Sequence, residues 1–282
     1  MQEMKPIVHV MGISGGKDSS ALAVYVRRRL PEIHAQMHYY FCDTGEELPE
    51  TYEYLDSLEV LLGKPISRLN PDKPFSHYLK MHGNLLPSPR QRWCTSQLKI
   101  KPFEKWLERE FGDAPILSYV AIRADENRDG YMSHRENVRA VYPFKEAGVD
   151  KEGVFRILEE EGVGLPKYYE WRTRSGCYFC FFQRKVEWAN LKDRHPELYE
   201  EAKRIESGLT NLKTGEPKNY SWSQGEWLSD LEKPERVKVI REMHEKAMED
   251  ERRRRKPSRL IEMFEDVLGD EDDTEPCAIC HL

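Results

Sequence analysis

Residues 6–19, PIVHVMGISGGKDS, decide the fold class of this 282-residue chain. Residues 6–13 are mostly apolar and partly β-branched, which is typical of a buried strand. The strand stops at Ser14-Gly15-Gly16-Lys17-Asp18-Ser19, and residues 20–30 (SALAVYVRRRL) then have apolar side chains at helical spacing. Paired glycines allow a tight turn, and the N–H groups that open a helix point toward an anion. The stretch therefore predicts a strand, an anion-binding loop and a helix.

The alternation of strand and helix continues beyond this stretch. Further strands are predicted at residues 37–42, 66–69 and 116–122, and further helices at 49–62 and 101–111. Strands that alternate with helices form a mostly parallel sheet that is covered on both faces. After residue 148 the periodic segments are helical and rich in aromatic residues. We therefore expect an α/β fold, with a mostly parallel doubly wound sheet and a helical C-terminal region.

Composition and charge narrow the class of protein. With 39% hydrophobic and 33% charged residues, the chain is too apolar to be wholly disordered and too polar to be a membrane protein. Its start lacks the basic and apolar regions of a secretory signal, so we expect a cytoplasmic protein. Thiols stay reduced there, so the six cysteines are read as metal ligands, redox groups or buried residues rather than as disulfides.

The loop and three later stretches resemble a known family. Ser14-Gly15-Gly16-Lys17-Asp18-Ser19 resembles the PP-loop signature of the ATP pyrophosphatases, also called adenine nucleotide alpha hydrolases, and its spacing differs from that of a Walker loop. The later stretches resemble the phosphoadenosine phosphosulfate (PAPS) reductase branch of this superfamily. They are residues 41–52 (FCDTGEELPETY), residues 122–128 (IRADENR, preceded by Ala121 where a glycine is usual) and Tyr142-Pro143-Phe144.

The resemblance implies that ATP or a related adenylyl nucleotide lies at the carboxyl end of the sheet. It assigns the phosphates to Ser14, Gly15, Gly16, Lys17, Asp18 and Ser19. Asp43 would lie near the nucleoside, and Arg123 would face the phosphate or sulfate end. From the residues alone, two other roles stay open: Asp43 capping the turn before residues 49–62, and Arg123 pairing with Asp125 or Glu126. Catalysis is expected from Lys17, Asp18, Arg123 and the tail residue Cys280.

The cysteines suggest a metal centre. Cys177-Tyr178-Phe179-Cys180 is a Cys-x-x-Cys pair, which alone fits a zinc knuckle, a redox pair, half of an iron–sulfur site or no site at all. Cluster ligation by scattered cysteines is common in the family that the chain resembles. The resemblance therefore implies a [4Fe–4S] cluster held by Cys94, Cys177, Cys180 and Cys277, with Zn²⁺ as the alternative. Cys42, at the end of a strand, is expected to be buried.

The predicted domains follow one another along the chain. They are a PP-loop nucleotide-binding domain (residues 1–148), a helical region with the Cys-x-x-Cys site (149–268) and a flexible acidic tail with terminal cysteines (269–282). The end of the tail, Cys277-Ala278-Ile279-Cys280-His281, resembles the Glu-Cys-Gly-x-His end of PAPS reductases, whose cysteine is the sulfur nucleophile. Alanine replaces the glycine and one cysteine is added, so Cys280 is open to a role as nucleophile, ligand or resolving thiol. A disordered tail with incidental cysteines is the remaining alternative.

Two basic clusters suggest a polyanionic partner. One is Arg252, Arg253, Arg254, Arg255 and Lys256, and the other is Arg90, Arg92, Lys99 and Lys101. Four consecutive arginines exceed what helical ion pairing needs, which favours contact with nucleic acid phosphates, whereas the neighbouring acidic residues also allow a solvated helix face.

Three functions remain open at this point. The intact Lys17-Asp18 pair favours an ATP pyrophosphatase that forms AMP and pyrophosphate with Mg²⁺ and adenylylates an acceptor for sulfur transfer. The acceptor would be nucleic acid, as in DNA phosphorothioation or tRNA thiolation, and the sulfur donor a cysteine desulfurase. The second function is a PAPS or adenylyl sulfate reductase that releases sulfite through a C-terminal cysteine, with thioredoxin as reductant. The third is a non-catalytic nucleotide-binding scaffold that holds zinc.

Overall fold

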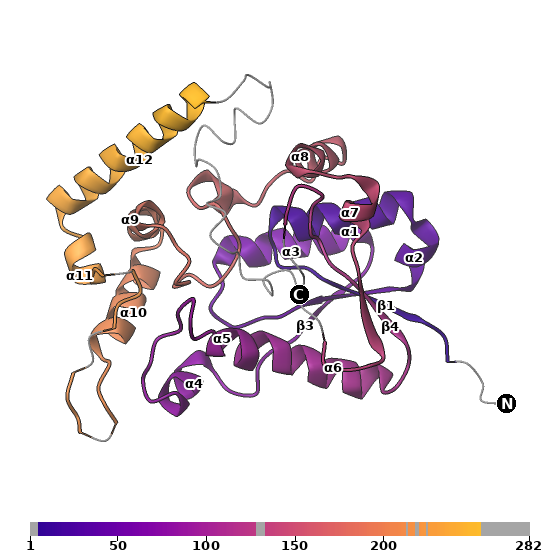
Figure 1. The fold of residues 1–282 in the computed structure, drawn as a ribbon, viewed down its shortest axis with the longest axis horizontal. Helices are drawn as coiled ribbons and strands as arrows, with labels where there is room; N and C mark the ends of the chain where they lie inside the picture. Colours follow the sequence, from indigo (N-terminus) through magenta and orange to yellow (C-terminus); the bar gives the residue numbers. More distant parts are fainter. Residues whose placement is uncertain (1–4, 128–132, 213, 218–219, 224, 255–282) are drawn as a thin grey trace. The chain divides into compact units, whose positions relative to one another are not determined.

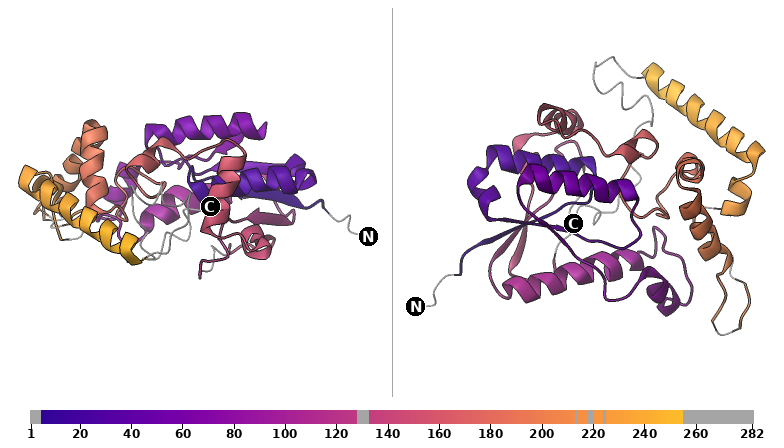
Figure 2. Two further views of the ribbon diagram at one scale, coloured as in Figure 1. Left: turned by 90° about the horizontal axis from the view of Figure 1, so that it is seen from above. Right: turned by 180° about the vertical axis from the view of Figure 1, so that it is seen from behind.

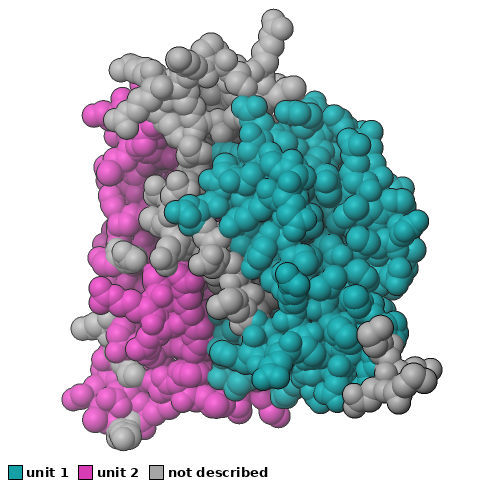
Figure 3. Space-filling view, turned by 45° about the vertical axis from the view of Figure 1, so that its right-hand side comes forward, with its two compact units in different colours: residues 1–72, 95–167, 274–282 teal, residues 73–94, 168–273 magenta. Residues whose placement is uncertain are grey.

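A computed structural model describes residues 5–127, 133–212, 214–217, 220–223 and 225–254. Within these ranges the chain forms two compact units, which Figure 3 colours separately. Unit 1 comprises the residues up to Asp72 together with Thr95–Lys167. Unit 2 comprises Lys73–Cys94 and the residues from Tyr168 onward.

Unit 1 is built on a five-stranded sheet in the order β3-β2-β1-β4-β5, in which all neighbouring strands are parallel (Figure 1). The strands are β1 (Val8–Gly12), β2 (Met37–Phe41), β3 (Ile66–Arg68), β4 (Ile116–Tyr119) and β5 (Val138–Val141). The expected parallel α/β sheet is therefore confirmed. Because β1 lies between β2 and β4, the direction of winding reverses between β1 and β4, and open α/β sheets bind ligands at such a point.

Helices cover both faces of this sheet. Helices α1 (Lys17–Arg29), α3 (Pro49–Leu62) and α8 (Lys151–Glu160) lie on one face and α6 (Lys101–Phe111) on the other (Figures 1 and 2). Successive strand residues alternate between the two apolar clusters, as Met11 and Val10 do in β1. The shorter elements of this part of the chain are α2 (Pro31–Gln36), a π-helical turn (Ser96–Ile100) and α7 (Pro143–Ala147), and α5 (Trp93–Thr95) includes residues of both units.

Unit 2 is helical and has an aromatic core. Its helices are α4 (Phe75–Met81), α9 (Lys185–Arg194), α10 (Pro196–Ser207), α11 (Leu228–Leu231) and α12 (Pro234–Arg254), and a 3₁₀ turn (Lys167–Glu170) comes before α9 in the chain. Phe179 contacts Phe75 with ring centroids 4.5 Å apart and stacks on Trp222 at 4.9 Å. Phe75 also stacks on Trp93 at 5.2 Å, so the segment around residues 75–93 packs with residues from the second half of the chain. The expected helical C-terminal region is confirmed.

The compact units interleave along the chain, whereas the expected domains follow one another. Helix α8 lies beyond the expected boundary at residue 148, yet Val154 and Leu158 are buried in the apolar cluster of unit 1. Lys73–Cys94 precedes that boundary and belongs to unit 2. Compactness does not show which segments fold independently, so the boundary at residue 148 stays a prediction. No helix in the described ranges is both long and apolar enough to cross a membrane.

Candidate nucleotide site and cysteine turn

The loop between β1 and α1 has a backbone shape that only glycine fits. Gly15 has φ +73°, in the left-handed region that other residues rarely adopt. A Cβ atom there would lie 2.7 Å from Cγ2 of Thr51 in α3, closer than any real contact. The loop therefore packs directly against α3 through a position that has no side chain.

Serine hydroxyls fix the rest of the loop. The backbone N–H of Ser14 donates to Oγ of Ser19 at 3.0 Å, and the two hydroxyl oxygens are also 3.0 Å apart. Ser20 Oγ donates to the carbonyl oxygen of Gly16 at 2.8 Å. Gly16 is the N-cap of α1 and has no side chain that could cap the first turn, so the start of the helix keeps its positive end directed at the loop.

A buried carboxylate joins two cations beside this loop. Oδ2 of Asp18 lies 3.3 Å from Nζ of Lys17, and Oδ1 lies 3.2 Å from Nη1 of Arg123. The exposed fractions of Lys17, Asp18 and Arg123 are 2%, 5% and 8%, so water screens these interactions weakly. Arg123 follows β4, whereas the other two residues follow β1. The network therefore lies at the carboxyl ends of β1 and β4, where the winding of the sheet reverses.

Further carboxylates hold Arg123 in place. Its Nε donates to Asp125 at 3.0 Å, and its Nη1 lies 2.9 Å from Glu126. Burial by itself lowers the pKa of the Arg123 guanidinium, but Asp18, Asp125 and Glu126 together raise that pKa above its ordinary value. Arg123 therefore pairs with both acidic residues that the sequence offered and also reaches the loop through Asp18.

Asp43 caps its own turn. Its Oδ1 accepts hydrogen bonds from the N–H of Gly45 at 2.9 Å and from the hydroxyl of Tyr52 at 2.8 Å. This geometry matches the capping role that the sequence left open. Asp43 also follows β2, so it lies at the same edge of the sheet as the loop, and a contact with a nucleoside stays a prediction.

The cysteine turn of unit 2 is held by two buried charged residues. Oε1 of Glu187 accepts from the N–H and the hydroxyl of Thr173 at 2.8 and 2.7 Å, and Oε2 accepts from the N–H of Arg184 at 2.9 Å. Glu187 thus ties together both ends of the segment that contains the Cys-x-x-Cys pair. Inside the segment, the guanidinium of Arg172 donates to the carbonyl oxygens of Gly176 and Cys177 at 3.0 and 2.8 Å.

Arg184 and Arg172 also act on the charge of Glu187. Burial raises the pKa of the Glu187 carboxyl, but the two arginines and the backbone hydrogen bonds outweigh burial and hold its pKa below the ordinary value. The carboxylate therefore stays ionised in the fold and keeps its acceptor role. Sequence reasoning missed both Glu187 and Arg172. Glu187 stands three residues after Arg184 in a capping arrangement, but the recognisable form of that pattern begins with serine or threonine.

The cysteine turn is closed by a backbone hydrogen bond, and its thiols are partly exposed. The N–H of Cys180 donates to the carbonyl oxygen of Cys177 at 3.1 Å, which closes the Cys-x-x-Cys turn. Cys94, Cys177 and Cys180 all belong to this unit, are partly exposed and form no disulfide. As the described side chains are placed, no three His, Cys, Asp or Glu residues form a group that could hold a metal ion. The cluster and its zinc alternative therefore stay predictions.

The side-chain amide of Gln183, next to the turn, is buried without hydrogen bonds to the described residues. Its side chain is 6% exposed, and neither its amide oxygen nor its amide nitrogen has a partner among the described residues. A buried polar group without a partner costs about 1–3 kcal/mol.

The remaining residues that the sequence analysis singled out are Cys42, the tail cysteines and the two basic clusters. Cys42 is buried, as predicted, and burial raises the pKa of its thiol to about 12. Arg128, Arg255, Lys256, Cys277 and Cys280 lie outside the described residues, and the side chains of Arg252, Arg253 and Arg254 are not described. In the second basic cluster, Arg90 and Arg92 belong to unit 2, whereas Lys99 and Lys101 belong to unit 1.

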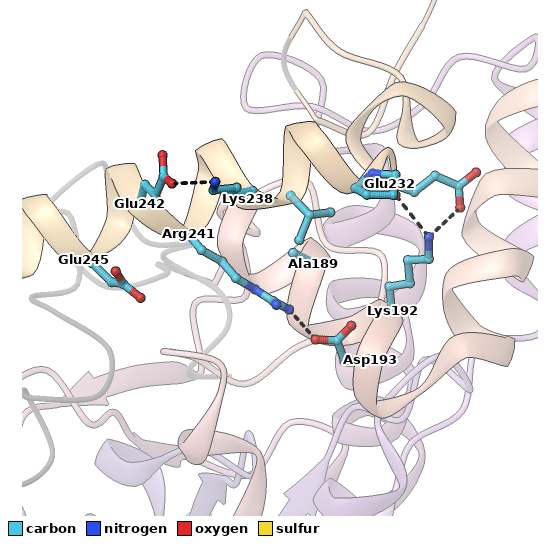
Figure 4. A pocket seen from close by; sticks show the side chains of 10 residues that line it. Ala189, Lys192, Asp193, Glu232, Lys238, Arg241, Glu242 and Glu245 are labelled. Carbon is cyan, nitrogen blue, oxygen red and sulfur yellow. Dashed lines mark hydrogen bonds and ion pairs between the residues drawn. The ribbon is translucent and has the colours of Figure 1, made fainter.

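A groove between α9 and α12 is lined by charges that neutralise one another (Figure 4). Arg241 pairs with Asp193, Lys192 lies 3.2 Å from Glu232, and Lys238 lies 3.8 Å from Glu242. The pair of Arg241 and Asp193 joins α12 to α9, and the pairing of the other charges leaves little net charge for a ligand. We therefore place the candidate chemistry at the loop and the cysteine turn rather than in this groove.

Comparison with known proteins agrees with the site in unit 1. Residues 8–140 match the family described as the phosphoadenosine phosphosulfate reductase domain. These residues form a PAPS reductase-type domain. They contain the loop, Asp43 and Arg123, so the resemblance to the PAPS reductase branch of the PP-loop superfamily is confirmed. The reductases after which the family is named are enzymes that act on sulfonucleotides.

The individual relatives have low sequence identity to this chain. The uncharacterized protein MJ0066 of Methanocaldococcus jannaschii is 27% identical over 206 residues, which are 70% of this chain and 40% of that protein. The uncharacterized nin region protein ORF290 of Escherichia phage lambda is 27% identical over 202 residues, 62% of this chain and 66% of that protein. The chain thus spans less than two thirds of either relative. The PAPS reductase of Candida auris, solved as a phosphate complex, has a TM-score of 0.46 and 14% identity, and the match covers 60% of this chain and 80% of that one.

Proposed function

We propose that this protein is a PP-loop ATP pyrophosphatase that activates an acceptor by adenylylation for sulfur transfer, with nucleic acid as the acceptor. The observation that carries the proposal is the buried network of Lys17, Asp18 and Arg123 at the carboxyl ends of β1 and β4. Two fixed cations beside a helix start are suited to the charge of a polyphosphate.

In the proposed reaction, an acceptor oxygen attacks the α-phosphorus of ATP. The bond from the α-phosphorus to the bridging oxygen breaks, and pyrophosphate leaves with the electron pair of that bond. The loop N–H groups and Lys17 would bind the leaving pyrophosphate, and Arg123 would balance charge on the α-phosphate. The terminal sulfur of a protein persulfide, supplied by a donor such as a cysteine desulfurase, then attacks the adenylylated atom, and AMP leaves with the electron pair of its bond to that atom. A thiol reductant cleaves the remaining S–S bond and leaves the sulfur on the acceptor. Mg²⁺ would arrive with the ATP phosphates and would balance part of their charge.

The metal centre is a separate part of the proposal. A [4Fe–4S] cluster, or Zn²⁺, would be held by Cys94, Cys177, Cys180 and Cys277. The orphaned amide of Gln183 supports a further group near the turn. The three described thiols, as placed, do not form such a site by themselves.

The family match favours a second candidate, because the domain is of the PAPS reductase type. In that reaction a C-terminal thiolate, from Cys277 or Cys280, would attack the sulfur of PAPS or adenylyl sulfate, and thioredoxin would reduce the resulting adduct and release sulfite. The third candidate, a zinc-holding nucleotide scaffold, would bind either nucleotide without turning it over.

One assay separates the candidates. The purified protein is given MgATP or PAPS, with and without an oligonucleotide and a sulfide donor, and the release of pyrophosphate and of sulfite is measured. We expect pyrophosphate release, and a Lys17→Ala variant should lower its rate by about 10²–10³-fold. Lys105→Ala, which removes an exposed lysine of α6, is the matched control and should change the rate less than twofold. Sulfite release from PAPS without consumption of ATP would establish the reductase instead, and binding without turnover would establish the scaffold.

A further inference from the structure

Two hydrogen bonds converge on one oxygen of Asp43. The hydroxyl of Tyr52 donates to Oδ1 at 2.8 Å, and the N–H of Gly45 donates to the same atom at 2.9 Å. The Gly45 bond closes the turn after β2 by itself, because an aspartate that bonds to the N–H two residues later forms an Asx turn. The Tyr52 bond adds a second restraint, which acts on the rotation of the carboxylate.

The ring of Tyr52 and the backbone of Asp43 are themselves held in place. The ring packs against the apolar cluster of unit 1 and meets the ring of Phe41 edge-on, with centroids 6.3 Å apart. On Phe41, in turn, Cζ of Arg68 lies 5.6 Å from the ring centroid. The N–H of Asp43 donates to the carbonyl oxygen of Leu69 at 3.1 Å, which extends the pairing of β2 with β3. Ring, hydroxyl and backbone together define one orientation of the carboxylate.

This carboxylate borders the same edge of the sheet as the glycine loop. At the end of β1, Gly12 is paired with Tyr40, and the N–H of Ile13 donates to the carbonyl oxygen of Tyr40 at 2.7 Å. Asp43 follows Tyr40 by three residues, and Ser14 follows Gly12 by two. Neighbouring strands are about 4.8 Å apart. A ligand whose phosphates lie at the loop therefore has its remaining part within reach of Asp43.

Asp43 and the loop complement different parts of a nucleotide. The loop N–H groups and Lys17 suit phosphates, whereas a carboxylate repels phosphates and accepts hydrogen bonds without donating any. Both bonds to the Asp43 side chain described above end on Oδ1, and neither uses Oδ2. The donor groups of a nucleotide are the hydroxyls of its ribose and the amino group of its base. A fixed acceptor beside the phosphate loop is suited to one of these donors.

We propose that Oδ2 of Asp43 accepts a hydrogen bond from a donor group of the bound nucleoside, and that Tyr52 is the positioning residue that orients this oxygen. The proposal deepens the function suggested above, because it names what the site recognises besides phosphate. It rests on that function for nucleotide binding but not for turnover, since PAPS and adenylyl sulfate also contain adenosine.

The test measures dissociation constants without turnover, by calorimetry in the presence of Mg²⁺. The ligands are α,β-methylene-ATP, its 2′-deoxy and 3′-deoxy forms, the form that lacks the amino group of the base, and pyrophosphate, which has no nucleoside. For the wild-type protein, loss of the donor that Asp43 recognises should weaken binding about 10–100-fold, as expected for a hydrogen bond to a charged group. Loss of either other donor should change binding less than about threefold.

Tyr52→Phe removes only the hydroxyl and should weaken the binding of α,β-methylene-ATP by about 3–10-fold. The variant should bind pyrophosphate normally, and its preference for the ligand that carries the recognised donor should shrink. A merely structural role of Tyr52 would instead lower the affinity for every ligand by the same factor.

Asp43→Asn tells the two kinds of donor apart. The N–H of Gly45 should keep the amide oxygen at the Oδ1 position, which places the amide nitrogen at the Oδ2 position. An amide N–H can donate to a ribose hydroxyl but cannot pair with the amino group of a base. Binding of α,β-methylene-ATP should therefore fall about 10–100-fold if Asp43 recognises the base, and less than about tenfold if it recognises the ribose.

Tyr39→Phe is the matched control, because it removes a tyrosine hydroxyl from β2 itself. This hydroxyl lies 2.9 Å from Nδ1 of His34 in α2. The control should change the affinity for each ligand less than about twofold. Thermal unfolding of every variant checks that it is folded.

Equal weakening of pyrophosphate and nucleotide binding by Tyr52→Phe would overturn the proposal, as would wild-type binding that is indifferent to all three donors. Donor preferences that survive unchanged in both Tyr52→Phe and Asp43→Asn would overturn it as well. Nucleotide binding with the expected preferences but without pyrophosphate release would refute the pyrophosphatase alone, so the two failures are distinguishable.

Discussion

A buried carboxylate organises the loop after β1, and another organises the cysteine turn. The first carboxylate binds cationic side chains, whereas the second binds mainly backbone groups. Asp18 holds two cationic side chains, Lys17 and Arg123, at set positions. Glu187 holds backbone, since its bonds go to both ends of the segment that contains Cys177 and Cys180. The loop is thus preorganised in its charge, whereas the turn is preorganised in its shape.

The loop holds its shape through bonds among its own polar groups, such as those between Ser14 and Ser19. Neither region satisfies every buried polar atom, because the hydroxyl of Thr51, which packs on Gly15, and the amide of Gln183, next to the turn, both lack a partner among the described residues. A preorganised charge cluster acts on a ligand as soon as the ligand arrives. A preorganised shape instead fixes the position of the groups that it carries, here the thiols of Cys177 and Cys180.

The largest effect is expected where the loop loses its central charge. Asp18→Asn removes the carboxylate from two buried ion pairs and leaves the cations uncompensated, which should lower the free energy of unfolding by about 3–5 kcal/mol. Asp56→Asn breaks the exposed pair with Arg68 and should change it by less than about 1 kcal/mol. Urea unfolding measures both variants. Similar values for the two would mean that the network is not the organising element of the loop.

Gly15→Ala tests the shape of the loop separately from its charge. The positive φ and the contact with Thr51 should together cost about 2–4 kcal/mol of unfolding free energy. Gly63→Ala has a similar φ but open space around the position, and should cost only about 1–2 kcal/mol. Adding Thr51→Ala to Gly15→Ala should recover part of the loss. Additive effects in this double-mutant cycle would argue against close packing of the loop on α3.

The pH dependence of the unfolding free energy tests the charge of Glu187 in the turn. The buried Glu206 of α10, whose pKa is shifted in the opposite direction, serves as the comparison. Glu187 has a lowered pKa, so its stabilising effect is present above its unfolded value of 4.5 and is lost as pH falls below it. Glu206 has a pKa raised by burial, which outweighs its two backbone hydrogen bonds, so its contribution is most favourable below 4.5 and declines as pH rises.

At pH 7, Glu187→Gln and Glu206→Gln should each cost about 1–3 kcal/mol, because an accepting oxygen becomes a donating amide. On lowering the pH to 4, the cost of Glu187→Gln should shrink and that of Glu206→Gln should grow. Urea midpoints at the two pH values measure this. Parallel changes in both variants would show that the arginines beside Glu187 do not set its charge.

The smallest expected effect concerns Cys42, which belongs to unit 1, whereas Cys94, Cys177 and Cys180 belong to unit 2. With a pKa of about 12, only about one thiol in 10⁴ is ionised at pH 8. Cys42 should therefore remain unmodified by iodoacetamide in the folded protein and react fully in urea, as read by peptide mass spectrometry. Rapid alkylation in the folded state would place a reactive thiol in unit 1 and weaken the contrast between the two sites.

The local elements of unit 1 could be predicted because their sequence signals are strong. The helix expected at residues 49–62 is Pro49–Leu62, and the strands expected at 37–42 and 66–69 are Met37–Phe41 and Ile66–Arg68. Val138–Val141 was missed because an edge strand of four partly exposed residues has no clear periodicity. Phe75–Met81 was missed as well, since a seven-residue helix gives a short pattern.

The sequence identified several residues of the site, but it did not predict the hydrogen bonds and ion pairs that join them. The loop motif identified Lys17 and Asp18, and the resemblance of residues 41–52 and 122–128 to the PAPS reductase branch pointed to Asp43 and Arg123. The bond from Asp18 to Arg123 spans 105 positions, and it depends on the order of strands in the sheet, which no local pattern encodes. Glu187 and Arg172 escaped notice for the same reason, because their roles arise only when a loop folds back on a helix.

The interleaving of the two units affects the order in which the protein can be completed on the ribosome. Phe75 and Trp93 emerge early, but Phe179, the ring that Phe75 contacts, is made 104 positions after Phe75. At about 5–20 residues per second, the early aromatic residues wait about 5–20 seconds for that partner. During that interval the strands on either side of Lys73–Cys94 can already pair, so the growing chain carries an unburied aromatic segment between them.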